Sequence, residues 1–293
     1  MHQFGRLAKR LSSGHAQHAP PAAYLLPDVR PIALDQPLQW LVLGWKDMAR
    51  SPWLSMGHGL FMALWGGLLT WLAHDQFWLL AGSISGFLVI APVLATSLYA
   101  MSRAMERGET VDFQLLISTW TQWQLKLKAQ PDSYWSLIRF GLLLAMAATG
   151  WVLTSSALIT LLAPAPIHAP MDFVRHVVLS QDGYLFELWL ALGGLMAAPV
   201  FASSVVSMPL LLDRRVSVLQ AVLTSWKTVL SHPVQMGLWA FLIMGFCLLG
   251  IFSLFMGLVF VVPMLGHASW HAYRDLIDTE GWPERLNRQE GQA

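Results

Sequence analysis

The sequence predicts an all-α protein, a polytopic transmembrane helical bundle whose six spans form three pseudo-repeats, each an amphipathic interfacial helix followed by a two-helix hairpin. Composition gives the class, because 55% of the 293 residues are hydrophobic and only 12% are charged. A soluble domain carries about 25% charged residues, so we expect this chain in a lipid bilayer. The net charge of +1 argues against nucleic acid as a partner, and the lone Cys247 argues against a disulfide framework or a Cys-based zinc site.

A recurring order of residues predicts the three repeats. Gln precedes Trp by six positions at 39/45, 114/120 and 220/226, and each pair is followed by a proline that opens an apolar stretch. A second proline lies inside each stretch, at Pro92, Pro199 and Pro263. Such self-similarity indicates one structural unit used three times. We expect repeats over residues 35–107, 110–215 and 216–277, within a six-span domain over residues 35–277, between a flexible cytoplasmic tail (1–34) and a cytoplasmic C-terminal tail (278–293).

The first repeat begins with an expected N-cap at Asp35 and an amphipathic helix that ends near Arg50. Apolar residues recur at helical spacing through it, so the helix is expected to lie in the membrane interface before the chain turns inward at Pro52. Residues 53–73 and 77–101 are long enough to cross a hydrocarbon core of about 30 Å.

The second and third repeats follow the same plan with two differences. Thr110 is the expected cap of the second amphipathic helix, and spans over residues 135–162 and 188–212 flank a hydrophilic insertion with a short surface helix near 170–179. Ser217 is the expected cap in the third repeat, whose hairpin is about ten residues shorter than the first. One helix over residues 234–265 would be about 48 Å long, so two short spans with a turn near residues 250–253 fit better.

The distribution of basic residues predicts the orientation. With six spans, 17 of the 18 Lys and Arg residues fall on the side of the termini, and only Arg175 falls on the other side. The positive-inside rule then places both termini in the cytoplasm.

Three segments resemble the signatures of a bacterial family of predicted integral membrane proteins, catalogued as domain of unknown function 2189. They are Gly44–Asp47, Ala91–Thr96 and the longer run Gly266–Leu276. The resemblance extends over roughly residues 34–277. It implies a multi-pass protein of the bacterial inner membrane and supplies no activity, substrate or cofactor.

Aligning the repeats on their inner prolines brings polar residues to equivalent positions. Thr96, Ser203 and His267 lie four residues after the prolines, and Ser97 and Ser204 follow in the first two repeats. His271 lies on the same helical face as His267, and His58 lies about a turn inside the first span. Ionisable groups at membrane depth are uncommon, so these seven residues are the candidate polar site. We expect His267 to hydrogen-bond to His58 or to Thr96 and Ser97.

Two other interpretations of these residues stay open. Ser and Thr in membrane helices commonly hydrogen-bond to their own helix, and interfacial histidines commonly bond to carbonyls or lipid headgroups. His58, His267 and His271 could instead bind a metal or haem iron. No cofactor is predicted, because His267 opens no HExxH motif and no third ligand is assured. No catalytic constellation or phosphate-binding loop emerges either.

Three functions are therefore compatible with the sequence. The first is a non-enzymatic protein whose bundle binds or passes a small solute. The second is an accessory or assembly subunit of a larger membrane complex, such as a respiratory oxidase, which would make other membrane proteins its partners. The third uses the histidines in a membrane enzyme or haem carrier.

Overall fold

The computed structural model describes residues 26–125, 131–180 and 183–284, and within helices it leaves out the side chains of residues 87–93 and 120–138. The regular structure of these residues is helical apart from one pair of two-residue strands. The elements are, in order, β1 (Asp28–Val29), α2 (Gln36–Arg50), α3 (Pro52–Leu72), α4 (Phe77–Leu94), α5 (Thr96–Glu106), α6 (Phe113–Leu125), α7 (Pro131–Leu162), α8 (Pro170–Phe173), η3 (Val174–Val178), α9 (Leu185–Ser204), α10 (Ser207–Asp213), α11 (Val218–Ser231), α12 (Pro233–Phe252), α13 (Leu258–Leu276) and β2 (Ile277–Asp278).

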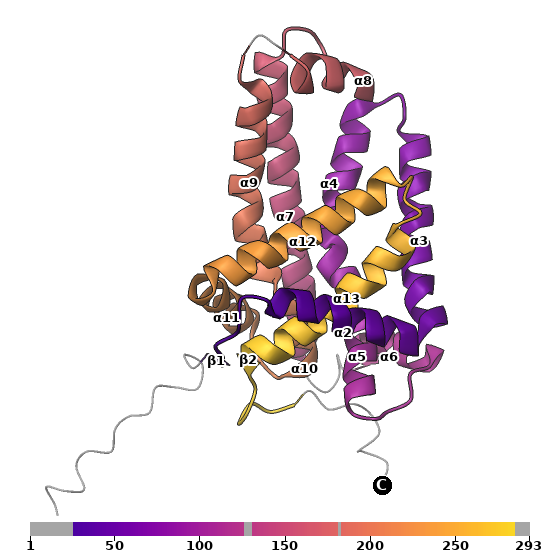
Figure 1. Cartoon of the computed structure of the whole chain (residues 1–293), viewed down its shortest axis with the longest axis vertical. Coiled ribbons are helices and arrows are strands. Elements are labelled where there is room, and N and C mark those ends of the chain that lie inside the picture. The colour runs from indigo at the N-terminus through magenta and orange to yellow at the C-terminus, as the bar shows by residue number, and fades with distance from the viewer. Residues whose placement is uncertain (1–25, 126–130, 181–182, 285–293) are drawn as a thin grey trace, which may run out of the picture.

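Four helices, α3, α4, α7 and α9, run along the long axis of the molecule, and α12 and α13 cross them obliquely (Figure 1). The short α8 lies at one end, while α5, α6, α10 and α11 gather at the other end, where α2 crosses the bundle (Figure 1). The third hairpin is short and tilted, because α12 ends at Phe252 and α13 starts at Leu258. This confirms the expected turn between two helices and rules out one continuous helix over residues 234–265.

Three helices of the described chain are long and apolar enough to cross a membrane. They cover residues Arg139–Leu162, Leu185–Asp213 and Pro233–Phe252. The other three expected spans coincide with α3, α4 and α13, which are not among these three helices. Membrane crossing by all six therefore stays a prediction.

Two expected spans are broken near their ends. Residues 77–101 divide into α4 and α5 around Ala95, and residues 188–212 divide into α9 and α10 around Val205 and Val206. Each break lies a few residues after an inner proline, which removes a backbone hydrogen bond and kinks a helix. Pro263 lies inside α13 without ending it.

The amphipathic helices α2, α6 and α11 match the expected ranges. Ser217 caps α11 by accepting a hydrogen bond from the backbone N–H of Gln220, as predicted. The cap of α6 is Asp112, which accepts from the N–H of Leu115, so the prediction of Thr110 was wrong. Each helix leaves apolar side chains exposed for lipid, among them Val42, Phe113 and Leu223.

The segment before α2 is tied to the end of the chain. Asp28 and Val29 pair antiparallel with Asp278 and Ile277, and Arg30 forms a 2.9 Å ion pair with Asp278. Residues 28–30 therefore do not belong to the flexible tail that we expected over residues 1–34. Residues 1–25 and 285–293 of the two predicted tails lie outside the described part of the chain.

The core of the molecule is built around α13. This helix packs on α2, α3 and α5, and its residues Ala268, Trp270, Tyr273 and Leu276 are almost completely buried. Small residues allow these close crossings, since a Cβ atom at Gly44 would overlap the backbone carbonyl of Met264, and one at Gly59 would overlap that of Val259.

If the three repeats were structurally equivalent, the helices that hold the inner prolines would meet at a common axis, and the structure shows such a meeting only in part. The main contacts of α4 are with α7, and those of α9 are with α7 and α11, rather than with α13. The segments that follow the first two prolines, α5 and α10, do contact each other and α13. The three-repeat architecture remains a prediction, and its best support is the contact among α5, α10 and α13.

Candidate functional site: a buried histidine relay and a histidine-lined groove

His267 lies at the centre of a buried chain of hydrogen bonds. Its side chain is 0% exposed, and each ring nitrogen contacts a serine from a different helix. Nε2 lies 3.0 Å from Ser55 Oγ of α3, and Nδ1 lies 2.7 Å from Ser102 Oγ of α5. The prediction that His267 bonds across helices is met, but its partners are Ser55 and Ser102 rather than His58, Thr96 or Ser97.

The chain of hydrogen bonds has one direction, which Asp47 sets. Ser102 donates its single hydroxyl proton to Asp47 Oδ2 at 2.8 Å, because an ionised carboxylate can only accept. Ser102 must then accept from the Nδ1–H of His267. Nε2 is consequently the unprotonated nitrogen, and it accepts the hydroxyl proton of Ser55. We call Ser55, His267, Ser102 and Asp47 the buried relay.

His271 completes the relay at the surface. Its Nε2 lies 2.8 Å from Asp47 Oδ2, and Arg50 Nη1 lies 3.4 Å from the other carboxylate oxygen. Burial alone would raise the pKa of the Asp47 carboxyl, but hydrogen bonds from His271 and Ser102, together with the nearby imidazoles, lower it below its usual 3.8. Asp47 is therefore charged at neutral pH, and it joins α2 to α5 and α13.

Three further polar residues of the segment Gly266–Leu276 also connect α13 to other helices. The indole N–H of Trp270 donates to Glu106, and Arg274 forms an ion pair with the same carboxylate. The Tyr273 hydroxyl donates to Asp213 at 2.8 Å. Two neighbouring carboxylates are also paired: Arg103 and Arg214 form ion pairs with Asp213, and Gln36 and Trp40 donate to Asp275.

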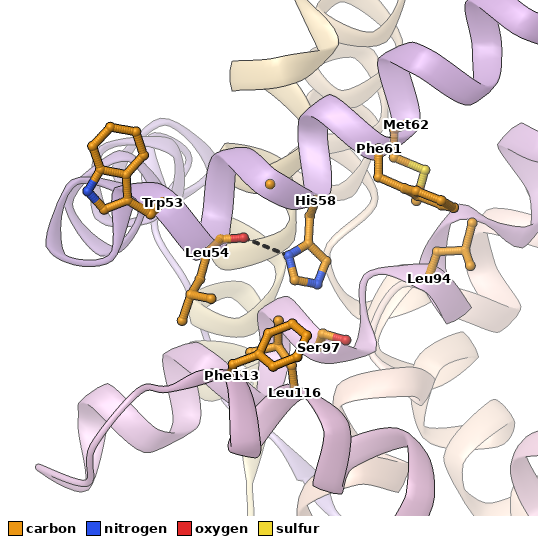
Figure 2. Close-up of a pocket in the computed structure, with 10 residues that line it drawn as sticks. Trp53, Leu54, His58, Phe61, Met62, Leu94, Ser97, Phe113 and Leu116 are labelled. Atoms are coloured by element: carbon orange, nitrogen blue, oxygen red, sulfur yellow. Dashed lines mark hydrogen bonds between the residues drawn. The ribbon is translucent and has the colours of Figure 1, made fainter.

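His58 belongs to a different environment, a groove of about 500 Å³ between α3, the junction of α4 and α5, and α6. Its Nδ1 lies 2.8 Å from the backbone carbonyl of Leu54, so this nitrogen carries the proton and donates. The other nitrogen, Nε2, points away from Leu54 toward the space above Ser97 and Phe113 (Figure 2). Apart from His58 and Ser97, the groove is lined by apolar and aromatic side chains and by Gly57.

The other predicted site residues are dispersed. Thr96 and Ser97 are buried at the start of α5, and Ser97 borders the groove. Ser203 accepts a hydrogen bond from the indole of Trp226, and Ser204 donates to the carbonyl of Val200 in its own helix. The seven candidates therefore do not form one cluster at a common depth. They divide among the buried relay, the groove and helix-packing contacts.

The geometry separates the three histidines that could have shared a metal or haem. Both nitrogens of His267 face serines, Nε2 of His271 faces Asp47, and His58 lies in the groove. Over residues 26–125, 131–180 and 183–284, no group of three or more His, Cys, Asp or Glu residues has a metal-binding arrangement.

Sequence reasoning missed three members of the buried relay, Asp47, Ser55 and Ser102. A signal for Asp47 was present, since it is the only acidic residue between Gln36 and His74. It also ends the segment Gly44–Asp47 that carries part of the family resemblance. The two serines gave no comparable signal, because a buried serine in a helix usually bonds to its own backbone.

Comparison with known proteins identifies a family match. A family described as predicted integral membrane protein (DUF2189) matches residues 79–213, from α4 to α10, which is a little under half of the chain. The resemblance inferred from Ala91–Thr96 is confirmed by this match, whereas Gly44–Asp47 and Gly266–Leu276 lie outside the matched residues. No curated protein and no solved structure shows significant similarity to the chain.

Proposed function

We propose that this chain is a membrane protein, like the family of predicted integral membrane proteins that residues 79–213 match. In this proposal the protein is non-enzymatic, and it binds a small lipophilic molecule in the His58 groove. The single observation that carries the proposal is the unprotonated Nε2 of His58, which faces an apolar groove of about 500 Å³. A concave apolar site with one or two placed polar groups is the usual form of a small-molecule site.

The chemistry of the groove indicates the class of ligand. Nε2 has no hydrogen-bond partner among the side chains that the structure describes, and as an acceptor it requires an O–H or N–H donor. Leaving an acceptor unpaired in apolar surroundings costs about 1–3 kcal/mol, which a ligand hydroxyl would recover. We therefore propose a molecule with a hydrocarbon body and a hydroxyl group.

The position of the groove favours entry from the membrane. Trp53 and Phe113 border the groove, and both side chains are largely exposed, as expected for residues at a lipid interface. A lipophilic alcohol could then enter laterally, with its hydroxyl near the interface. We further propose six spans with cytoplasmic termini, which the charge distribution and the hairpins support, and a bacterial inner membrane, which the family resemblance implies.

A photoreactive long-chain alcohol tests the proposal. The full-length protein in detergent micelles is irradiated with a diazirine-bearing alcohol and, separately, with the methyl ether of the same probe, which cannot donate a hydrogen bond. We expect the alcohol to label α3, α5 or α6 several-fold more strongly than the ether, and His58→Leu to remove this preference.

Two glycines of α3 provide a matched pair of blocking variants. A Cβ atom meets nothing within 4 Å at either Gly57 or Gly67, but only Gly57 lines the groove. Gly57→Leu should abolish labelling, whereas Gly67→Leu should leave it unchanged. Equal labelling by alcohol and ether in the wild type, or undiminished labelling of Gly57→Leu, would refute the proposed site.

A further inference from the structure

A second, smaller cavity lies toward the opposite end of the molecule from the His58 groove. It has a volume of about 210 Å³ and lies between α4, α7 and α9, with Phe173 of α8 at its border. This end of the molecule is the one at which α8 lies, away from the described ends of the chain (Figure 1).

Five of the eleven residues that line this cavity are aromatic. Phe77 stacks on Phe173 with ring centroids 5.2 Å apart, and Phe173 meets Trp189 edge to face at 5.3 Å. Trp151 lies 5.5 Å from Trp189. The described lining contains no charged side chain. The walls therefore suit a flat, uncharged molecule, because offset and edge-on ring contacts are favourable.

Two serine hydroxyls that line the cavity have no acceptor for their protons among the described residues. Ser155 Oγ accepts the indole N–H of Trp189 at 2.7 Å, so its own O–H remains available as a donor. The side chain of Ser85 makes no hydrogen bond with the described part of the chain. By contrast, Thr149, Thr154 and Ser204 on the neighbouring helices donate to their own backbone carbonyls. An unmade hydrogen bond in an apolar cavity is unfavourable, so both hydroxyls favour a ligand with acceptors.

We infer that this aromatic cavity is a binding site for a flat, uncharged one- or two-ring carbonyl compound, of which a quinone ring is the simplest type. Carbonyl oxygens would accept from Ser85 and Ser155, while the ring would lie against the Trp and Phe side chains. A quaternary ammonium ion would suit the ring faces but offers no acceptor, and an alkyl chain offers none either. This site is independent of the proposed function at His58, whose free nitrogen requires a donor.

Binding of 2-methyl-1,4-naphthoquinone tests the assignment. The full-length protein in detergent should show saturable quenching of tryptophan fluorescence by this compound. Ser85→Ala should weaken the affinity about fivefold, the weight of one hydrogen bond, while Ser83→Ala on the same helix should not. Ser85→Leu should abolish saturable quenching by filling the cavity. Gly86→Leu is its control, since a Cβ atom at Gly86 meets nothing within 4 Å and Gly86 does not line the cavity.

Competition separates this ligand class from the others. Decanol and tetramethylammonium should displace the naphthoquinone only weakly. Displacement by decanol at equal concentration would indicate a site for a lipid chain, and displacement by tetramethylammonium would indicate a cation site. Either result would overturn the assignment, as would wild-type affinity in a folded Ser85→Leu protein. None of these outcomes bears on the alcohol labelling at His58.

Discussion

Asp47 determines the state of every side chain in the buried relay. As a carboxylate it accepts from Ser102 and His271, and Ser102 in turn fixes the tautomer of His267. One buried charge thus orients side chains from α3, α5 and α13. Such a fully connected network specifies one packing of the helices, because any broken link leaves a buried group unpaired.

The Asp47→Asn variant should reveal this charge through the pH dependence of stability. The folded-state pKa of Asp47 lies below its usual 3.8, so its stabilisation is present above that pH and is lost as the pH falls through the folded pKa. We expect Asp47→Asn to be less stable than the wild type by about 2 kcal/mol at pH 7, with the difference shrinking below about pH 4. Melting in detergent from pH 3 to pH 7 measures this, and a difference that does not change with pH would contradict it.

Replacing His267 by Phe should destabilise the protein. The ring volume is kept, but Ser55 loses its acceptor and Ser102 loses a donor in a completely buried site. We expect a loss of about 2 kcal/mol. The triple variant Ser55→Ala/Ser102→Ala/His267→Phe should recover part of it, since no unpaired hydroxyl then remains. A single variant as stable as the wild type would show that the relay contributes nothing to the fold.

The candidate site could be predicted from the sequence only in part. The sequence alone singles out His267, because an imidazole is unusual at membrane depth. The structure shows it buried, with hydrogen bonds to two other helices. Its partners could not be derived, because Ser55 and Ser102 lie 212 and 165 residues from it in sequence. The alignment of repeats suggested Thr96 and Ser97 instead. The break between α4 and α5 moves the helix register, so equivalent positions in sequence do not occupy equivalent positions in space.

At the scale of elements, α13 connects the parts of the molecule that the hairpins leave separate. It packs against α2 and α3 through Gly44 and Gly59, where side chains would prevent contact. Its polar residues then pair with carboxylates on α2, α5 and α10. The helices themselves could be predicted from periodicity and prolines. The oblique crossing of α13 could not, because it depends on pairs of small residues from distant segments.

Gly44→Ala tests the crossing of α2 and α13. In an open helix position this substitution is favourable by roughly 0.5–1 kcal/mol, but here the added Cβ atom overlaps the carbonyl of Met264 and the Cβ atom of Ala268. We expect destabilisation by about 1–3 kcal/mol. Gly237→Ala on α12 is the matched control, since its Cβ atom meets nothing within 4 Å, and it should be neutral or stabilising. Both melting temperatures are measured in the same detergent, and equal effects would argue against a close crossing.

At the scale of the whole molecule, the distribution of charged residues agrees with the arrangement of the helices. The ion pairs that surround Asp213 and Glu106 lie where α5, α10 and α13 meet, at the end of the molecule that also holds the described ends of the chain (Figure 1). Nearly all the basic residues fall on this side if each hairpin enters and returns. Three helices are long and apolar enough to cross a membrane, and the family match is to predicted integral membrane proteins, but α3, α4 and α13 need a direct test.

Reporter fusions decide between six spans and fewer. A periplasmic reporter joined after residue 75 or 175 should be active, because both positions lie in connections at the end opposite the ion-pair cluster. The same reporter after residue 120, 220 or 290 should be silent, and a cytoplasmic reporter should give the reverse pattern. The tilt of α12 and α13 makes position 290 the most informative, since their turn at residues 253–257 lies well short of the end formed by α8 (Figure 1). An active periplasmic fusion at 290, together with silent fusions at 220, would mean that the third hairpin crosses the membrane once. The two termini would then lie on opposite sides of the membrane, and the three-repeat architecture would be wrong even though all its helices are present.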